Sequence, residues 1–150
     1  MKKILMAVII CLLTTGFVYA AEKGTAKEAQ DLVAKAIAYY KANGKDKAFA
    51  AINEPNGQFT NKKDLYVFVF DFKGFCLAHG ANKALIGKNL MELKDTNGKQ
   101  FMKKIIDGAK SKGKGWEDYT WTNPTTKKID SKSSYYVKEG DLVFVCGIYK

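Results

Sequence analysis

Aromatic and hydrogen-bonding side chains are concentrated between Gly113 and Tyr135, where the sequence reads GKGWEDYTWTNPTTKKIDSKSSY. Aromatic rings together with a few polar groups are what a small-molecule pocket requires. The candidate pocket residues in this stretch are Trp116, Tyr119, Trp121, Lys132 and Tyr135. A lysine beside aromatic walls can neutralise an anion, so the chemistry indicated is binding rather than catalysis.

A second group of candidates lies in the apolar run Asp64–Gly80, DLYVFVFDFKGFCLAHG, which contains the only histidine of the chain. Alternate residues of a strand share a face, and one face of the first predicted strand carries Tyr66, Phe68 and Phe70. The other face is also apolar, so the pattern leaves open which face lines a pocket. His79 is either a partly buried histidine bonded to a backbone carbonyl or a donor to a ligand carboxylate.

The same alternation separates the aromatic residues near position 120. It places Tyr119 and Trp121 on one face of their strand and Trp116 on the other, unless a bulge at Gly115 intervenes.

Motifs for catalysis and metal binding are missing from the sequence. There is no GxSxG, no HExxH and no phosphate-cradling glycine loop, and the single histidine has no nucleophile partner in a motif. A metal site is disfavoured because no second histidine exists and because Cys76 and Cys146 lie in strand-like runs. We therefore expect no enzyme activity, no catalytic residue, no metal and no cofactor.

Residues 1–20 have the pattern of a signal peptide. Lys2 and Lys3 precede an apolar run from Ile4 to Val18, and Val18-Tyr19-Ala20 is a small-x-small cleavage site. The run is short for a bilayer span, although an uncleaved anchor is the alternative. We expect cleavage after Ala20, a periplasmic location and a single domain over residues 21–150.

The chain is basic, with 25 Lys and Arg against 15 Asp and Glu and a formal net charge of +10. The lysines are scattered among acidic residues, which is typical of a solvated surface. They also give the molecule a bias toward anions. Nucleic acid is disfavoured as a partner because no arginine-rich stripe or nucleic-acid-binding motif occurs.

Two helices are predicted ahead of the first strand. Thr25 and Glu28 form a capping box, and apolar residues follow at helical spacing until Gly44. A second helix is predicted from Lys45 to about Ile52.

The rest of the chain alternates strands with one further helix. Strands are predicted at 65–72 and 75–79, and a short helical turn near Leu90–Leu93. A connecting helix carries apolar residues from Phe101 to Ala109, and three strands follow at 115–122, 133–138 and 142–149. This order predicts an α+β fold with a five-stranded antiparallel sheet.

Several phrases together resemble the single Cache domains of the second type, which are PAS-like extracytoplasmic sensor modules. The phrases are DLYVFVFDFKG, AHG, IGKNLMELKD, GKGWEDYTW, NPTTKK, KSSYYVK and GIYK. The resemblance covers about Gly24 to Lys150. It implies a long N-terminal helix packed on a PAS-like sheet, with a small organic anion such as a short-chain carboxylate held between the sheet and the connecting helix.

The resemblance also bears on individual residues. It favours ligand roles for His79, Trp116 and Lys132, because these lie in the matching phrases. The usual PAS strand order, second-first-fifth-fourth-third, puts Cys76 and Cys146 on strands that flank the first strand. Two such strands lie about 9 to 10 Å apart, which is too far for a disulfide, so we expect free thiols.

Two functional readings follow. The first is a periplasmic small-molecule sensor that acts through a separate membrane-bound signalling or transport partner. The second is a structural or protein-interaction module whose pocket is filled. A charged or hydrogen-bonding lining around His79 and Lys132 favours the first, and a pocket filled by Trp and Phe side chains favours the second. The sequence leaves ligand identity and oligomeric state open.

Overall fold

The computed structural model describes residues 22–60 and 63–150. The signal peptide expected at residues 1–20 lies outside the described residues. The elements in chain order are α1 (Ala26–Asn43), α2 (Lys45–Asn53), β1 (Val67–Asp71), β2 (Cys76–His79), the 3-10 helix η1 (Lys83–Leu85), α3 (Phe101–Lys112), β3 (Lys114–Thr122), β4 (Ile129–Glu139) and β5 (Leu142–Tyr149).

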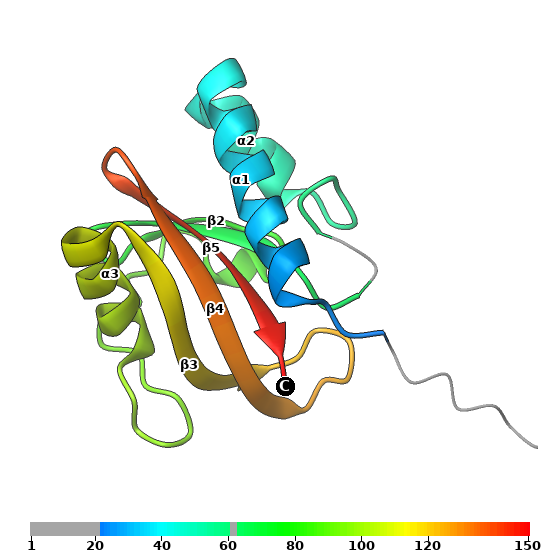
Figure 1. Cartoon of the computed structure of the whole chain (residues 1–150), viewed down its shortest axis with the longest axis vertical. Helices are drawn as coiled ribbons and strands as arrows, with labels where there is room; N and C mark the ends of the chain where they lie inside the picture. Colours follow the sequence, from blue (N-terminus) through cyan, green and yellow to red (C-terminus); the bar gives the residue numbers. More distant parts are fainter. Residues whose placement is uncertain (1–21, 61–62) are drawn as a thin grey trace, which may run out of the picture.

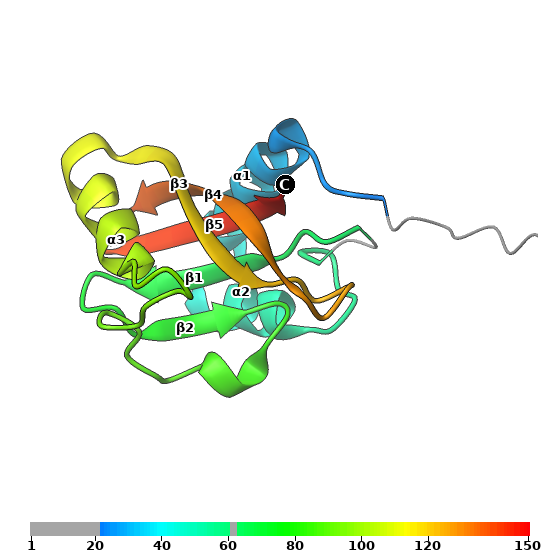
Figure 2. The same ribbon diagram turned by 90° about the horizontal axis from the view of Figure 1, so that it is seen from below.

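The strands form one antiparallel sheet in the order β2-β1-β5-β4-β3. Strand β4 lies between β3 and β5 (Figure 1). Helices α1 and α2 pack on one face of this sheet, and α3 packs on the other (Figure 2). The predicted α+β class and the predicted strand order are therefore confirmed.

Helix α1 begins and ends where the sequence predicts. The Thr25 side chain accepts from the amide of Glu28, while the Glu28 carboxylate accepts from the amide of Thr25 at 2.8 Å. This capping box satisfies two amides that the first helical turn leaves without partners. Gly44, with φ of 79°, ends the helix in a conformation that glycine adopts without strain.

Two expectations about local structure differ from what the structure shows. The segment Leu90–Leu93 is a hydrogen-bonded turn rather than a helical turn, closed by the Leu93 amide on the Leu90 carbonyl. The helical turn lies earlier, at η1, where the Asn82 side chain accepts from the amide of Ala84. Strand β4 begins at Ile129 rather than Ser133, because the first residues of β4 continue the ladder with the end of β3.

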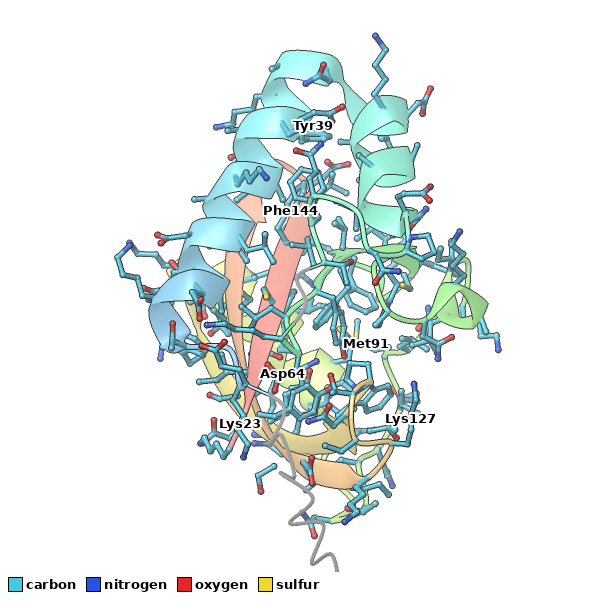
Figure 3. The ribbon with its side chains drawn as sticks, turned by 90° about the vertical axis from the view of Figure 1, so that its right-hand side faces the viewer. Lys23, Tyr39, Asp64, Met91, Lys127 and Phe144 are labelled. Atoms are coloured by element: carbon cyan, nitrogen blue, oxygen red, sulfur yellow. The ribbon has the colours of Figure 1, made fainter. Side chains whose placement is uncertain are left out.

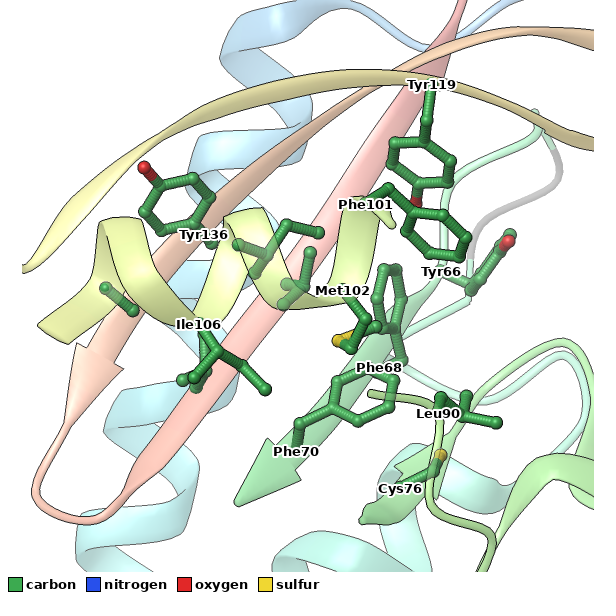
Figure 4. Packing of buried hydrophobic residues seen from close by; sticks show 14 of the residues in the cluster. Tyr66, Phe68, Phe70, Cys76, Leu90, Phe101, Met102, Ile106, Tyr119 and Tyr136 are labelled. Atoms are coloured by element: carbon green, nitrogen blue, oxygen red, sulfur yellow. The ribbon is translucent and has the colours of Figure 1, made fainter. Parts of the chain in front are cut away.

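The sheet separates two apolar clusters. Under α1 and α2 lies Phe144 of β5, which is labelled in Figure 3. Its ring packs against that of Tyr40, with centroids 5.5 Å apart. Under α3, the other cluster contains Phe68, Phe70 and the apolar face of the helix (Figure 4). Cys76 belongs to this second cluster and Cys146 to the first, and both are buried free thiols, as predicted.

Across residues 22–60 and 63–150, none of the helices has both the length and the apolar character that crossing a bilayer would require.

Candidate functional site

A small cavity lies between the sheet and α3, with a volume of about 10 Å³. That is room for about one water molecule. Its lining comes from the segment before β1, from β1 to β4, from η1 and the loop after it, and from α3. The lining residues are Tyr66, Phe68, Phe70, His79, Leu85, Leu90, Phe101, Met102, Tyr119, Trp121 and Lys132.

Lys132 of β4 supplies the only lysine side chain in this lining and is 1% exposed. Its Nζ donates to the hydroxyl of Tyr66 at 2.6 Å. The same Nζ lies 4.1 Å from the ring centroid of Tyr66, 5.2 Å from that of Phe68 and 4.9 Å from that of Tyr149. The ammonium group is therefore surrounded by aromatic rings, which attract a cation through their quadrupoles.

The Lys132 ammonium has no counter-ion in the described part of the chain. Six ion pairs join other lysines to carboxylates there, and Lys132 takes part in none of them. Burial without a counter-charge penalises the ammonium form. It lowers the pKa of Lys132 from its ordinary value to about 7, although Cys146 and Asp64 act in the opposite direction.

A chain of hydroxyl groups fixes the acceptor that Lys132 uses. The Tyr149 hydroxyl donates to the Thr122 carbonyl at 2.9 Å, and the hydroxyls of Tyr66 and Tyr149 are 3.2 Å apart. Because the Tyr149 proton is used on Thr122, Tyr66 donates to Tyr149. Its oxygen therefore accepts from Lys132.

His79 presents a second donor to the cavity. Its Nδ1 accepts from the amides of Ala81 and Asn82 at 3.2 and 2.9 Å, which leaves Nε2 to carry the proton. Nε2 has no hydrogen-bond partner among residues 22–60 and 63–150. Burial and the nearby Lys132 charge lower the pKa of His79 to about 3, so the ring is neutral near pH 7.

Stacked rings form the apolar walls (Figure 4). Tyr119 stacks on Phe101 of α3 with centroids 4.1 Å apart, and Trp121 meets the edge of Phe101 at 5.4 Å. Phe68 lies against His79 at 5.4 Å. The site is thus an aromatic box with a lysine and a histidine nitrogen at its polar end.

Gly147 of β5 makes the position of Lys132 possible. Lys132 pairs with Tyr149 in the β4–β5 ladder, and its side chain crosses β5 to reach Tyr66. A Cβ on Gly147 would overlap the Cε of Lys132 and the Oγ of Ser134. The missing side chain therefore leaves the slot in which the lysine lies.

Seven of the nine predicted site residues line this cavity, and Trp116 and Tyr135 do not. These two pair across the β3–β4 ladder and pack on each other at 5.2 Å, on the α1 face of the sheet. The ladder has no register shift at Gly115, so Trp116 stays opposite to Tyr119. Tyr135 is three residues from Lys132 on one strand, which also puts it on the opposite face.

The sequence does not identify several lining or supporting residues. Leu85, Leu90, Phe101 and Met102 line the cavity, but nothing in their spacing distinguishes them from ordinary core residues. Gly147 and Tyr149 lie in the phrase GIYK, which was used only for the resemblance. That phrase was the one signal that could have identified them.

The described part of the chain contains no group of three or more His, Cys, Asp or Glu residues arranged to hold a metal ion.

Solved structures with the same fold come from chemotaxis proteins. A methyl-accepting chemotaxis protein from Vibrio parahaemolyticus superposes with a TM-score of 0.68 at 24% identity, over 82% of this chain and 86% of that one. A Cache chemosensory domain described in terms of carboxylic acid recognition gives a TM-score of 0.62 at 20% identity, over 82% of this chain and 86% of that one. At these identities the likeness establishes the fold.

Sequence comparison finds a relative among sensor histidine kinases. The sensor histidine kinase MctS of Rhizobium johnstonii is 35% identical over 85 residues, which are 57% of this chain and 18% of the kinase. The chain thus spans less than a fifth of that relative. The profile of the family Single Cache domain 2 matches residues 15–150, nearly the whole sequence. The chain therefore belongs to the Single Cache domain 2 family, whose sensor domains occur in chemotaxis receptors and histidine kinases.

Proposed function

We propose that this protein is a periplasmic sensor domain that binds a small organic anion, such as a short-chain carboxylate, and acts through a separate membrane-bound signalling or transport partner. The observation that carries the proposal is the buried Lys132 amine, which has no carboxylate partner among residues 22–60 and 63–150. A buried charge is costly unless it is paired. A ligand carboxylate would provide the missing partner.

The geometry also suggests how the anion would lie. Nζ of Lys132 and Nε2–H of His79 would donate to the two carboxylate oxygens at the polar end. The alkyl group would lie among the aromatic walls. The Cache domain described for carboxylic acid recognition has the same fold and supports this ligand class.

Binding requires the cavity to expand. A carboxylate with four or more heavy atoms needs more than the present space of about 10 Å³. The walls opposite the sheet come from η1, the loop after it and the first turn of α3, through Leu85, Leu90, Phe101 and Met102. We propose that these walls move outward when the ligand enters, which would carry the ligand state to the surface of the molecule.

The small volume also supports a second candidate function. A pocket packed by its own Phe and Trp side chains is what a structural or protein-interaction module would have. Such a module would gain no stability from small carboxylates. Neither candidate requires enzyme activity.

A thermal-shift series separates the two candidates. Acetate, propionate, lactate and pyruvate, together with amino acids as a comparison, are added to the protein. A ligand at a hundred times its Kd stabilises by about 2.7 kcal/mol, so the sensor account predicts a rise in Tm with a small monocarboxylate. Lys132→Met should abolish the rise because the charge-assisted bond is lost.

The matched control is Lys128→Met, which removes an exposed lysine from the loop before β4. It should respond like the wild type. If no carboxylate raises the Tm of the wild type, or if the Tm of Lys132→Met still rises, the proposal of an anion site is wrong and the interaction module gains support.

A further inference from the structure

We infer that above neutral pH the cavity takes up a proton with the anion that it binds, so that ligand and Lys132 form a neutral pair inside the protein. This inference rests on the proposed function and adds to it the charge state in which the site works. It follows from the hydrogen-bond acceptor of Lys132 and from the protonation states of the ionisable groups around it.

The surroundings of Lys132 suit a neutral amine as long as the cavity is empty. Its hydrogen-bond acceptor is the Tyr66 hydroxyl oxygen, at 2.6 Å, and a neutral amine can donate to that oxygen as well as an ammonium can. The hydroxyl chain to Tyr149 and Thr122 stays intact in either state. Loss of the proton therefore breaks no hydrogen bond and removes a buried charge.

Ionisable groups act on Lys132 from four parts of the fold, and Cys146 does so from the opposite face of the sheet. They are Asp64 and Tyr66 before β1, His79 of β2, Tyr119 of β3, and Cys146 and Tyr149 of β5. From η1, the loop after it and α3, the cavity receives only apolar side chains. Asp64 acts on Lys132 through space, while its carboxylate accepts from the amide of Gly24 at 2.8 Å.

Cys146, the three tyrosines and His79 do not gain or lose a proton near neutral pH. Burial raises the pKa of Cys146 to about 12 and raises those of the three tyrosines above their ordinary value. His79 stays neutral because its pKa is lowered to about 3. Lys132, with a pKa of about 7, is the group that changes charge.

A bound carboxylate would restore the positive charge. An anion within hydrogen-bond distance favours the ammonium form and raises the pKa of the lysine again. At a pH above 7 the complex therefore gains a proton from solvent. A ligand with a second charge would leave that charge buried without a partner, so dicarboxylates and zwitterionic amino acids should be excluded.

Isothermal titration calorimetry measures this proton directly. Sodium acetate, and sodium propionate as a second probe, are titrated into the full chain at pH 6 and pH 8. Each titration is done in two buffers of different ionisation enthalpy, since the enthalpy difference reports the protons taken up. Both probes are ionised at these pH values, because carboxyl groups of this type have a pKa of about 4.

From a lysine pKa of about 7, uptake should be about one-tenth of a proton at pH 6 and about nine-tenths at pH 8. The affinity should be about tenfold weaker at pH 8. Lys128→Met should reproduce these values, and Lys132→Met should show weak binding with no uptake. Binding without proton uptake at pH 8 overturns this inference and leaves the proposed function standing, whereas absence of binding by both probes overturns both.

Discussion

Lys132 determines most of what this site can do. A lysine on the surface of a protein lowers its stability little. Here the side chain is buried, and its charge has no partner in the described chain. Retaining such a group lowers the stability of the empty protein. The proposed role in binding an anion would account for its presence, whereas a purely structural role would be met by an apolar side chain.

The first prediction concerns pH and the stability of the empty protein. The folded-state pKa of Lys132 is lowered to about 7 from 10.5, so between these values the unfolded chain holds a proton that the folded one does not. The free energy of unfolding should therefore rise with pH above 7. Above about pH 9 the buried thiols oppose this trend, because they ionise only after unfolding.

Urea denaturation at pH 7 and pH 9 tests this prediction. The wild type should gain roughly 2 kcal/mol over the interval. Lys132→Met should be more stable than the wild type at pH 7 and should lose the dependence. A wild-type stability that is flat or falling over this interval would show that Lys132 keeps its charge in the empty protein.

At the level of elements, β5 contributes through an absent side chain. Gly147 lies between Tyr149 and Val145 on the face under α3, and the Lys132 side chain crosses it. Its φ lies outside the left-handed region, so alanine is compatible with the backbone there. The constraint at this position is therefore one of space.

The second prediction uses this constraint. Gly147→Ala should displace Lys132 from Tyr66 and abolish the carboxylate-dependent rise in Tm, because the new methyl group occupies the slot. Circular dichroism should show an unchanged secondary structure. The control is Gly113→Ala. Gly113 lies at the end of α3, where a Cβ would meet nothing within 4 Å but φ is 80°. This variant should lose some stability and keep the carboxylate-dependent rise in Tm. A full response from Gly147→Ala would show that the slot is not required.

The elements themselves were predictable because their signals are local. The capping box at Thr25 and the glycine at position 44 set the ends of α1, and alternation separated Trp116 from Tyr119 correctly. The prediction of a helical turn at Leu90–Leu93 is wrong, because an apolar segment of four residues is too short to distinguish a helical turn from other turns. The slot at Gly147 could not be derived, because it depends on a side chain from the neighbouring strand that crosses over it.

At the scale of the whole molecule, the fold places one aromatic face of the sheet against α3 and the other apolar face against α1 and α2. The cavity is therefore closed by α3, η1 and the loop between them. Ligand entry has to displace these elements, which gives the sensor account a physical means of reporting occupancy.

The third prediction concerns export. If residues 1–20 are removed as proposed, N-terminal sequencing of protein from the periplasmic fraction should begin at Ala21. Replacing Ala20 by a bulky residue should block the cleavage and leave the protein in the membrane fraction. Recovery of the wild type with an intact Met1 would favour the uncleaved anchor.

The most direct test of the central claim is a crystal structure of the protein with the monocarboxylate that gives the largest thermal shift. The account predicts density for the ligand between the sheet and α3, with a carboxylate oxygen within hydrogen-bond distance of Lys132 Nζ and the other near His79 Nε2. It also predicts outward displacement of Phe101 and Met102. Ligand density at another place, or a cavity that stays closed with Lys132 bonded only to Tyr66, would contradict the account.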